Sequence, residues 1–327
     1  YNTDLRKWLG KILEEALSGT ITAYYTQFGE GVHARVQFIV KTEPGKVPEI
    51  SGPDIEAALV QAGRTWADLL QDALVEAKGE EAGLTLFRRY GEAFPTSYRE
   101  HTLPQAAIFD IGRVEEVVAT GGIGLNLYRP IEAAEHQVSF KLYHDASPLP
   151  LSDVLPVMEN LGLNVISEHP AEVRLPDRDA SIWIHDFTAE SQDGRPIDLH
   201  AVKKPFQDAF FRVWAGEMED DGFNRLVLAA GLMWREVTVL RAYGKYLRQA
   251  RFPFGQDSLE DTLAAHPAIA RLILDLFKTQ FDPAAEGERA KQAERLNAEL
   301  TGALDGVANL DEDLILRRYI NLVRCTL

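Results

Sequence analysis

The sequence predicts an α+β protein in which two mixed units of strands and helices precede an all-helical region. Three observations support this prediction. Apolar residues alternate with polar ones between Ile21 and Val40, as in a hairpin with one buried face. A strand, helix, strand, strand order between Leu125 and Phe187 is typical of α+β layering. From about Leu199 onward this alternation stops, and helical periodicity continues to the end.

The first mixed unit is predicted to span residues 1–118. Its opening helix is expected from apolar residues that recur on one helical face: Leu5, Trp8, Leu9, Ile12 and Ala16. Ser18 and Gly19 end that helix, and a hairpin with its turn at residues 29–31 follows. A loop rich in Pro and Gly then leads into one long helix from Ile55 to Gly79. Two shorter helices are predicted over residues 84–90 and 104–118.

A Gly-rich break at residues 119–124 predicts the boundary to a second mixed unit, residues 119–198. Its predicted strands cover residues 125–127, 138–142, 163–166, 171–175 and 181–187, with a helix over residues 151–161. The helical region takes residues 199–327. There Ser258 and Asp261 fit a capping box, Pro267 suits the first position of a helix, and Asp311 is expected to cap the last helix.

Composition narrows the function classes. The 327 residues carry 34 basic and 50 acidic side chains, a net charge of −16, which disfavours binding to nucleic acid. No apolar run approaches the ~18 residues of a membrane span, and the single cysteine, Cys325, suits a reducing cytoplasm. We expect Cys325 to be a small core residue. Because the chain begins at Tyr1 without methionine and stops just after an apolar helical pattern, we interpret it as a piece of a longer protein.

The sequence lacks the familiar catalytic motifs. It contains no phosphate-binding GxxxxGK[ST], no HExxH and no GxSxG, and the Gly-rich residues 120–126 precede a strand, not a helix, so they indicate a turn. One candidate is left. His144 with Asp145, and His185 with Asp186, end two neighbouring predicted strands and could converge on a metal or a general base. A metal-dependent hydrolase built on His144 and His185 is therefore an alternative reading.

A basic stripe marks one predicted helix. Arg241, Lys245 and Arg248 lie at the spacing of one helical face, and an acidic cluster over residues 217–221 precedes them. The stripe is either a solvated face or a docking surface for another domain or subunit, and we take Arg241, Lys245 and Arg248 as interface candidates.

Several stretches resemble a known family. Residues 147–166 (SPLPLSDVLPVMENLGLNVI), 231–249 (GLMWREVTVLRAYGKYLRQ), 265–271 (AHPAIAR) and 281–283 (FDP) are similar to the very large bacterial NAD-specific glutamate dehydrogenases. The likeness runs through almost the whole chain and is tightest from Val138 to Pro283. In that family several ACT-type modules and helical motifs precede the catalytic domain.

The resemblance implies two ACT-like modules, residues 1–118 and 119–198, followed by a helical region that leads to the catalytic domain. The catalytic lysine and aspartate and the dinucleotide loop of the family would lie beyond Leu327. NAD would be bound in that domain, and neither a catalytic residue nor a cofactor or metal is expected in residues 1–327.

The implied function is regulation and oligomerisation of an enzyme that oxidatively deaminates glutamate to 2-oxoglutarate and ammonia with NAD. Alone, the chain would be inactive, and it would work in the cytoplasm. Its partners would be its own catalytic domain and other copies of the same chain, with an amino acid as a possible effector. Neither nucleic acid nor a membrane is expected as a partner.

ACT modules commonly bind an amino acid at the turn between their first strand and first helix, and amino-acid sensing is therefore an alternative function. The corresponding turn begins at Asp145. Its candidate ligand-binding residues are Asp145, Ser147, Ser152 and Asp153. Leu149 and Pro150 stand where the family's glycine is expected, and because proline has no amide hydrogen to donate, this departure favours assembly over sensing.

Overall fold

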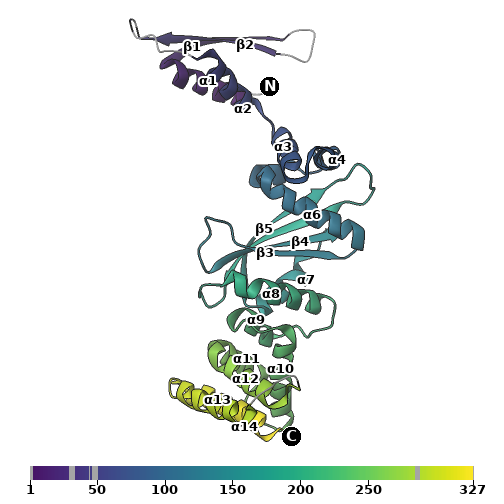
Figure 1. Cartoon of the computed structure of the whole chain (residues 1–327), viewed down its shortest axis with the longest axis vertical. Helices are drawn as coiled ribbons and strands as arrows, with labels where there is room; N and C mark the ends of the chain where they lie inside the picture. The colour runs from purple at the N-terminus through teal and green to yellow at the C-terminus, as the bar shows by residue number, and fades with distance from the viewer. Residues whose placement is uncertain (1–2, 29–33, 44, 46–50, 284–287, 327) are drawn as a thin grey trace. The chain divides into compact units, whose positions relative to one another are not determined.

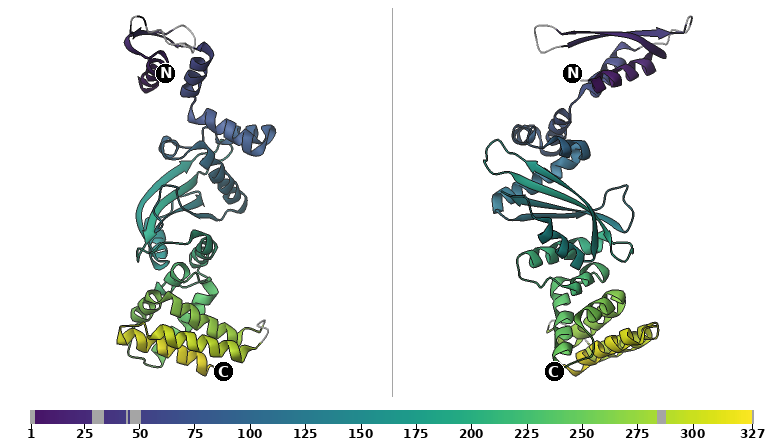
Figure 2. Two further views of the ribbon diagram at one scale, coloured as in Figure 1. Left: turned by 60° about the vertical axis from the view of Figure 1, so that its left-hand side comes forward. Right: turned by 180° about the vertical axis from the view of Figure 1, so that it is seen from behind.

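The computed structural model of the chain describes residues 3–28, 34–43, 45, 51–283 and 288–326. They form two compact units, Tyr1–Ile111 and Gly112–Leu327, and the division falls inside helix α6 (Pro104–Thr120). Both units can be followed in Figures 1 and 2. Within the described ranges, no helix is long and apolar enough to cross a lipid bilayer.

The first unit combines an antiparallel hairpin with helices. Its elements are α1 (Thr3–Leu17), β1 (Gly19–Phe28), β2 (Ala34–Thr42), α2 (Gly52–Gly63), α3 (Trp66–Lys78), α4 (Glu80–Tyr90), α5 (Thr96–His101) and the first part of α6. The predicted opening helix and hairpin are confirmed, and the predicted turn at residues 29–31 lies outside the described residues. Gly10 lets α1 approach the hairpin closely, since a Cβ atom there would lie 2.8 Å from Ile21.

The predicted single helix from Ile55 to Gly79 is wrong, because a capping box divides it. The Thr65 hydroxyl accepts a hydrogen bond from the Asp68 amide at 3.2 Å, and the Asp68 carboxylate accepts one from the Thr65 amide at 2.8 Å. The same bonds to Thr65 hold the pKa of Asp68 below its ordinary value. Apolar periodicity continues across this break, so spacing alone conceals it.

The second unit is built on a four-stranded antiparallel sheet with the strand order β3-β4-β6-β5. Its elements are β3 (Ile123–Tyr128), β4 (Gln137–Asp145), α7 (Leu151–Asn160), β5 (Leu163–Val173), β6 (Ile182–Ser191) and α8 (Leu199–Trp214). Strands β4 and β5 run parallel with β6 between them, so β4, α7 and β5 form a split β-α-β unit. The arrangement is ferredoxin-like, with the edge strand β3 placed before the split unit and not after the last helix.

Helices cover both faces of this sheet, as Figure 1 shows. On one face Phe140 of β4 packs against Phe206 and Phe210 of α8, with ring centroids 5.4 and 4.9 Å apart. On the other face Val117 of α6 reaches the sheet beside Gly124, where an added Cβ atom would lie only 3.0 Å from the valine methyl group. Burial of the apolar residues on the helix-covered faces stabilises the layers.

The predicted pair of strands at residues 163–166 and 171–175 is a single strand, β5, with a bulge between Val165 and Ser167. The bulge shifts the side-chain alternation midway, which made one strand read as two. Pro170 lies in the same edge strand and offers no amide to a further strand. At the opposite edge, Gln207 of α8 accepts the hydrogen bond of the outward Leu127 amide at 2.8 Å. One position at each sheet edge is therefore unable to donate an amide hydrogen bond to a further strand.

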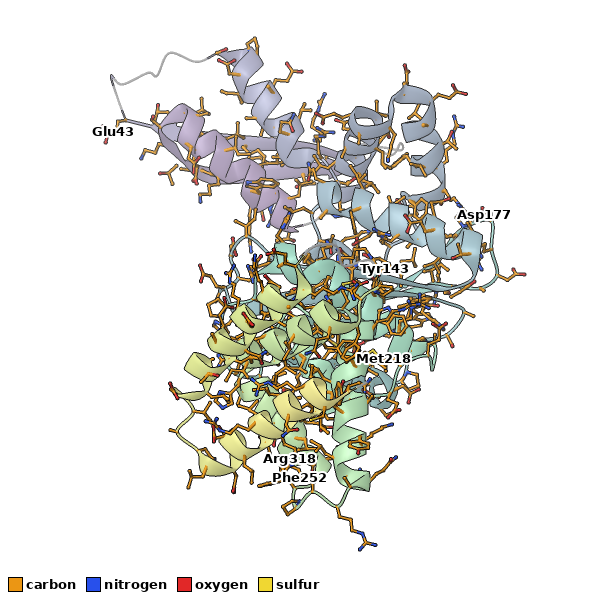
Figure 3. All side chains as sticks on the ribbon, turned by 60° about the horizontal axis from the view of Figure 1, so that its bottom comes forward. Glu43, Tyr143, Asp177, Met218, Phe252 and Arg318 are labelled. Atoms are coloured by element: carbon orange, nitrogen blue, oxygen red, sulfur yellow. The ribbon has the colours of Figure 1, made fainter. Side chains whose placement is uncertain are left out.

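Helices occupy the remainder of the second unit. They are η1 (Gly222–Asn224), α9 (Arg225–Ala229), α10 (Trp234–Gln249), α11 (Gln256–Ala265), α12 (Pro267–Phe281), α13 (Arg289–Leu304) and α14 (Leu310–Cys325). One apolar core runs without interruption from the sheet, through Met218 in the segment after α8, to the last helices. Figure 3 labels Met218 and also Phe252 and Arg318, whose guanidinium lies 5.6 Å from the Phe252 ring centroid.

Pro267 opens α12 as predicted. The other predicted helix caps in this region are not formed. Ser258 lies inside α11, which starts at Gln256, so it forms no cap. The last helix is capped by Asn309, whose side-chain oxygen accepts the Asp311 amide at 2.9 Å, and not by Asp311 itself.

Candidate functional site

Hydrogen bonds to other residues of the same chain hold the turn between β4 and α7 in place. Asp145 accepts two hydrogen bonds from Arg178, at 2.9 and 2.8 Å, and Ala146 adopts a left-handed conformation with φ of 72°. Such a φ is costly for alanine, and the bond from the Ala146 amide to Ser181 at 3.0 Å helps to hold it. Ser152 and Asp153 lie exposed in the first turn of α7, where they bond to each other at 3.2 Å.

The buried side chain of His185 is hydrogen-bonded to this turn. It is 2% exposed, its Nε2 accepts the Leu149 amide at 3.1 Å, and its Nδ1 lies 2.6 Å from a carboxylate oxygen of Glu168. Because Nε2 accepts, the proton is on Nδ1 and is donated to Glu168. The amide of Leu149, a residue that stands where the resemblance leads us to expect a glycine, is thus already bonded inside the protein.

The predicted convergence of the two His-Asp pairs is wrong. Adjacent strand residues point to opposite faces, so His185 lies on one face while Asp186 lies on the other, with the Tyr128 hydroxyl at 2.9 Å. His144 bonds through Nδ1 to the Ser147 carbonyl at 2.9 Å, and both ring nitrogens of His185 are used. No group of three or more potential metal ligands gathers among the described residues. The geometry therefore removes the basis for the metal-hydrolase reading.

The predicted basic stripe does not form one exposed surface. The Arg241 side chain is 4% exposed and binds Asp221 twice, through Nε at 2.8 Å and Nη2 at 2.9 Å, and it also donates to Asn224. Lys245 pairs with Glu219 at the surface, and Arg248 donates to Gln256 at 2.9 Å. The acidic cluster upstream is thus the partner of Arg241 and Lys245 within the same chain, and the burial of Arg241 does not fit its assignment as an intermolecular contact.

Cys325 also differs from the prediction. It is exposed, and its thiol bonds to the Asn321 side chain at 3.2 Å. The predicted apolar face of α14 is real, with Ile315, Tyr319 and Val323 buried, whereas Cys325 lies exposed in the final turn.

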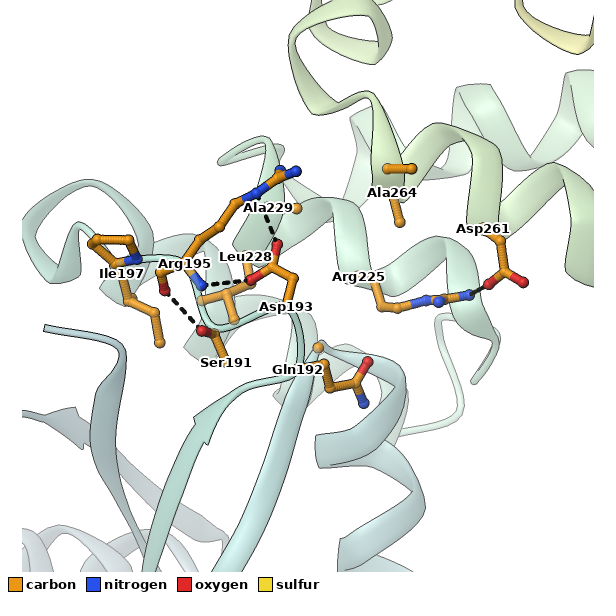
Figure 4. A pocket seen from close by; sticks show the side chains of 13 residues that line it. Ser191, Gln192, Asp193, Arg195, Ile197, Arg225, Leu228, Ala229, Asp261 and Ala264 are labelled. Carbon is orange, nitrogen blue, oxygen red and sulfur yellow. Dashed lines mark hydrogen bonds and ion pairs between the residues drawn. The ribbon is translucent and has the colours of Figure 1, made fainter. Parts of the chain in front are cut away.

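A pocket that the sequence did not indicate lies between the β6–α8 loop and helices α9 and α11 (Figure 4). Its volume is about 450 Å³. Two ion pairs border it, Arg225 with Asp261 at 2.7 Å and Arg195 with Asp193 at 3.5 Å, and Figure 4 shows them at opposite sides of the pocket. These residues come from segments far apart in sequence and follow no motif spacing, so only tertiary packing reveals the pocket.

Near this pocket, burial shifts the pKa of one acid. Glu260 in α11 is 6% exposed, and desolvation raises the pKa of its carboxyl, although a hydrogen bond from Gln256 at 2.8 Å opposes this. Burial likewise lowers the pKa of Lys203 in α8, with a smaller contribution from Arg113.

The split β-α-β sheet with its helix layer, followed by a packed helical region, defines a protein of the ACT-module class. Sequence profiles agree with the geometry. They match, in chain order, the glutamate dehydrogenase ACT2 domain (residues 1–67), helical motif 2 (73–117), ACT3 domain (122–202) and helical motif 3 (218–283).

Curated relatives extend the match over the whole chain. The NAD-specific glutamate dehydrogenase of Halomonas elongata is 42% identical over 327 residues, that of Pseudomonas aeruginosa 39% over 331 and that of Mycobacterium tuberculosis 32% over 345. The chain belongs to the family of large NAD-specific glutamate dehydrogenases. It spans about a fifth of the length of these relatives, 20%, 20% and 21%.

Proposed function

We propose that the chain is a regulatory and assembly segment of an NAD-specific glutamate dehydrogenase. The whole enzyme would convert glutamate, NAD and water to 2-oxoglutarate, ammonia and NADH, with NAD bound in a catalytic domain outside these residues. The segment would itself be inactive, would act in the cytoplasm, and would contact that catalytic domain and other copies of the same chain.

The observation that carries the proposal is the continuous core of the second unit. Buried residues extend from Phe187 in the sheet through Phe206 in α8 and Leu240 in α10 to Ile315 in α14. Because packed interiors are dense and deform little, a displacement at the sheet is passed on to the helices. An ACT-like module with its own separate core would not transmit strain in this way.

Blocked positions at the two sheet edges limit how copies of the chain can associate. The bulge and Pro170 of β5, and Gln207 over the edge of β3, disfavour a continuous sheet across two copies. Helix faces are the better surfaces for self-association, and α10 presents the exposed Tyr246, 55% accessible, on such a face.

A chimaera tests the proposal. The corresponding segment of the Halomonas elongata relative is replaced by this chain, and a second protein lacks the segment. We expect the chimaera to keep both glutamate-dependent NADH formation and oligomeric mass, and the deletion to change the mass measured by light scattering. This chain alone should scatter as more than one copy and form no NADH.

Two results would contradict the proposal. NADH production from glutamate by the isolated chain would show that it holds catalytic groups, and an unchanged mass together with unchanged kinetics after deletion would leave the segment without either role.

Amino-acid sensing at the β4–α7 turn is the weaker alternative, because the Leu149 amide already donates its hydrogen bond to His185. One feature favours it: Nη1 of Arg178 is buried beside Asp145 and lacks a hydrogen-bond partner within the described residues. Loss of amino-acid binding in Asp153→Asn or Ser152→Ala, measured by calorimetry, would support this alternative.

A further inference from the structure

We propose that the pocket between the β6–α8 loop and helices α9 and α11 binds an α-amino acid in its zwitterionic form. The pocket is separate from the β4–α7 turn, and the proposal does not depend on self-association of the chain.

The size and walls of the pocket suit a small ligand. Its volume of about 450 Å³ falls in the range of roughly 300–1,000 Å³ that is usual for small-molecule sites. One part of its wall is apolar and is formed by Ile197, Leu228, Ala229 and Ala264. An aliphatic side chain placed there would lose contact with water, which favours binding.

The charged groups around the pocket balance. Two arginines, Arg195 and Arg225, and two aspartates, Asp193 and Asp261, line it, and the other lining residues carry no formal charge. A zwitterion offers a carboxylate for an arginine and an ammonium for an aspartate, so it leaves this neutral arrangement neutral. A dianion or a dication would meet as many like charges as opposite ones, and a dianion is further repelled by the net charge of −16.

These side chains retain capacity for a ligand. Within the described part of the chain, the only side-chain interaction of Arg195 is the 3.5 Å ion pair with Asp193, and its side chain is 56% exposed. Such an exposed, loosely held pair is worth little, so the guanidinium can turn to a ligand carboxylate at small cost. Asp261 has a side chain that is 66% exposed and can accept from an ammonium group while it keeps Arg225.

Arg225 is held more firmly and would serve as the fixed part of the site. Its Nε donates to the Gly222 carbonyl at 3.1 Å while Nη2 pairs with Asp261 at 2.7 Å. Its side chain is 25% exposed, so the guanidinium is already oriented before a ligand arrives.

Binding there would link the sheet module to the helices. Asp193 and Arg195 belong to the loop after β6, whereas Arg225 and Asp261 belong to α9 and α11. A ligand that engages both sets lowers the free energy of the arrangement in which loop and helices are close. Amino-acid concentration would thereby bias the packing between the module and the helical region.

Calorimetric titration of the whole chain with each of the twenty L-amino acids, up to about 5 mM, tests the proposal. We expect heat of binding from amino acids with uncharged aliphatic side chains. For the tightest of them, the carboxamide and the acid without the amino group should each bind about tenfold more weakly or worse, since each lacks one of the two charges.

Variants locate the site. Arg195→Gln and Asp261→Asn should each weaken binding about tenfold or more, and Ala264→Leu should block the pocket without removing a charge. Arg174→Gln, an arginine whose side chain is 76% exposed on the β5 side, and Ser152→Ala at the turn are the matched controls and should bind as the parent does. Circular dichroism confirms that each variant is folded.

Silence across all twenty amino acids would overturn the proposal, as would binding that survives Arg195→Gln, Asp261→Asn and Ala264→Leu, or that is lost in Ser152→Ala. Light scattering of the same samples reports self-association independently, so failure of this site and failure of the assembly role can be told apart.

Discussion

Two basic residues one turn apart on α10 show how burial changes what a charge does. Arg241 and its partner Asp221 have side chains only 4% and 12% exposed, whereas those of Lys245 and Glu219 are 44% and 57% exposed. The buried pair has lost its water and is held by several hydrogen bonds. Removing one member leaves the other charge without compensation, while the surface pair is screened.

Arg241→Ala is therefore expected to lower the free energy of unfolding by about 3–5 kcal/mol. Lys245→Ala is the matched control on the same helix face, and its effect should stay below about 1 kcal/mol. Urea denaturation followed by circular dichroism measures both values. Similar effects of the two substitutions would show that Arg241 is not buried as described.

Glu260 gives a pH-dependent prediction. Burial raises the pKa of its carboxyl in the folded protein above the ordinary value, so the ionised form of the side chain destabilises the fold. As pH falls through the raised pKa, the folded state binds the proton first and regains stability. Glu260→Gln should thus be more stable than the parent at pH 7. This difference in stability should shrink as the pH falls toward the ordinary pKa range of a glutamic acid.

The measurement is the urea midpoint of Glu260→Gln and of the parent at pH 7, 6, 5 and 4, with Glu294→Gln on the exposed side of α13 as the control. A difference between parent and Glu260→Gln that grows as the pH falls would contradict the expected sign.

At the scale of elements, α10 and α14 approach each other at a glycine. A Cβ atom at Gly244 would lie 2.7 Å from both the Phe223 ring and the Tyr319 hydroxyl. That hydroxyl is buried and has no hydrogen-bond partner within the described residues, and desolvation raises the pKa of Tyr319 far above its ordinary value. The close helix contact thus depends on a residue without a side chain.

Gly244→Ala should destabilise the protein by about 1–3 kcal/mol, because the added methyl group overpacks the contact. Tyr319→Phe should be neutral or slightly stabilising, since it removes an unsatisfied buried hydroxyl, and it should recover part of the loss in the double variant. Gly302→Ala, where the added methyl meets open space in α13, is the control and should stabilise by up to about 1 kcal/mol.

The stabilities of these four variants are read from thermal or urea unfolding. If Gly244→Ala proved as harmless as Gly302→Ala, the close packing of α10 on α14 would be refuted.

At the scale of the whole molecule, the continuous core of the second unit makes sheet and helices one cooperative body. Leu240 of α10 is fully buried in this core, whereas Leu310 at the start of α14 is 85% exposed. A cavity at position 240 should therefore weaken the sheet as well as the helices, although Leu240 belongs to no strand.

In Leu240→Ala the slowest amides of β6 and of α10 should exchange faster. Their free energy of opening should fall by the same amount in both elements, about 2–5 kcal/mol. Leu310→Ala should leave both unchanged. Faster exchange in α10 with unchanged exchange in β6 would mean that module and helices unfold separately, and the proposed transmission of strain would lose its basis.

Local patterns in the sequence determined much of this protein: the hairpin, the strand-helix-strand order of the second unit, the helices from Leu199 onward and the glutamate dehydrogenase family. The secondary-structure features depend on periodicity of 2 or 3.6 residues, which is visible within a short window, whereas the family was indicated by the resemblance of particular stretches such as residues 147–166 and 231–249. The same local rule failed where a cap or a bulge interrupts a periodic run, at Thr65 and in β5.

Only the tertiary structure decided which charged groups meet. The acidic residues near 220 and the basic residues of α10 were visible as complementary, but whether they pair within one chain or between chains depends on how η1 packs on α10. Packing of distant segments likewise decides which groups His185 and Asp186 contact. It also forms the pocket bordered by Arg195 and Asp261. Sequence spacing encodes neighbours along one element, whereas sites of this kind are made between elements.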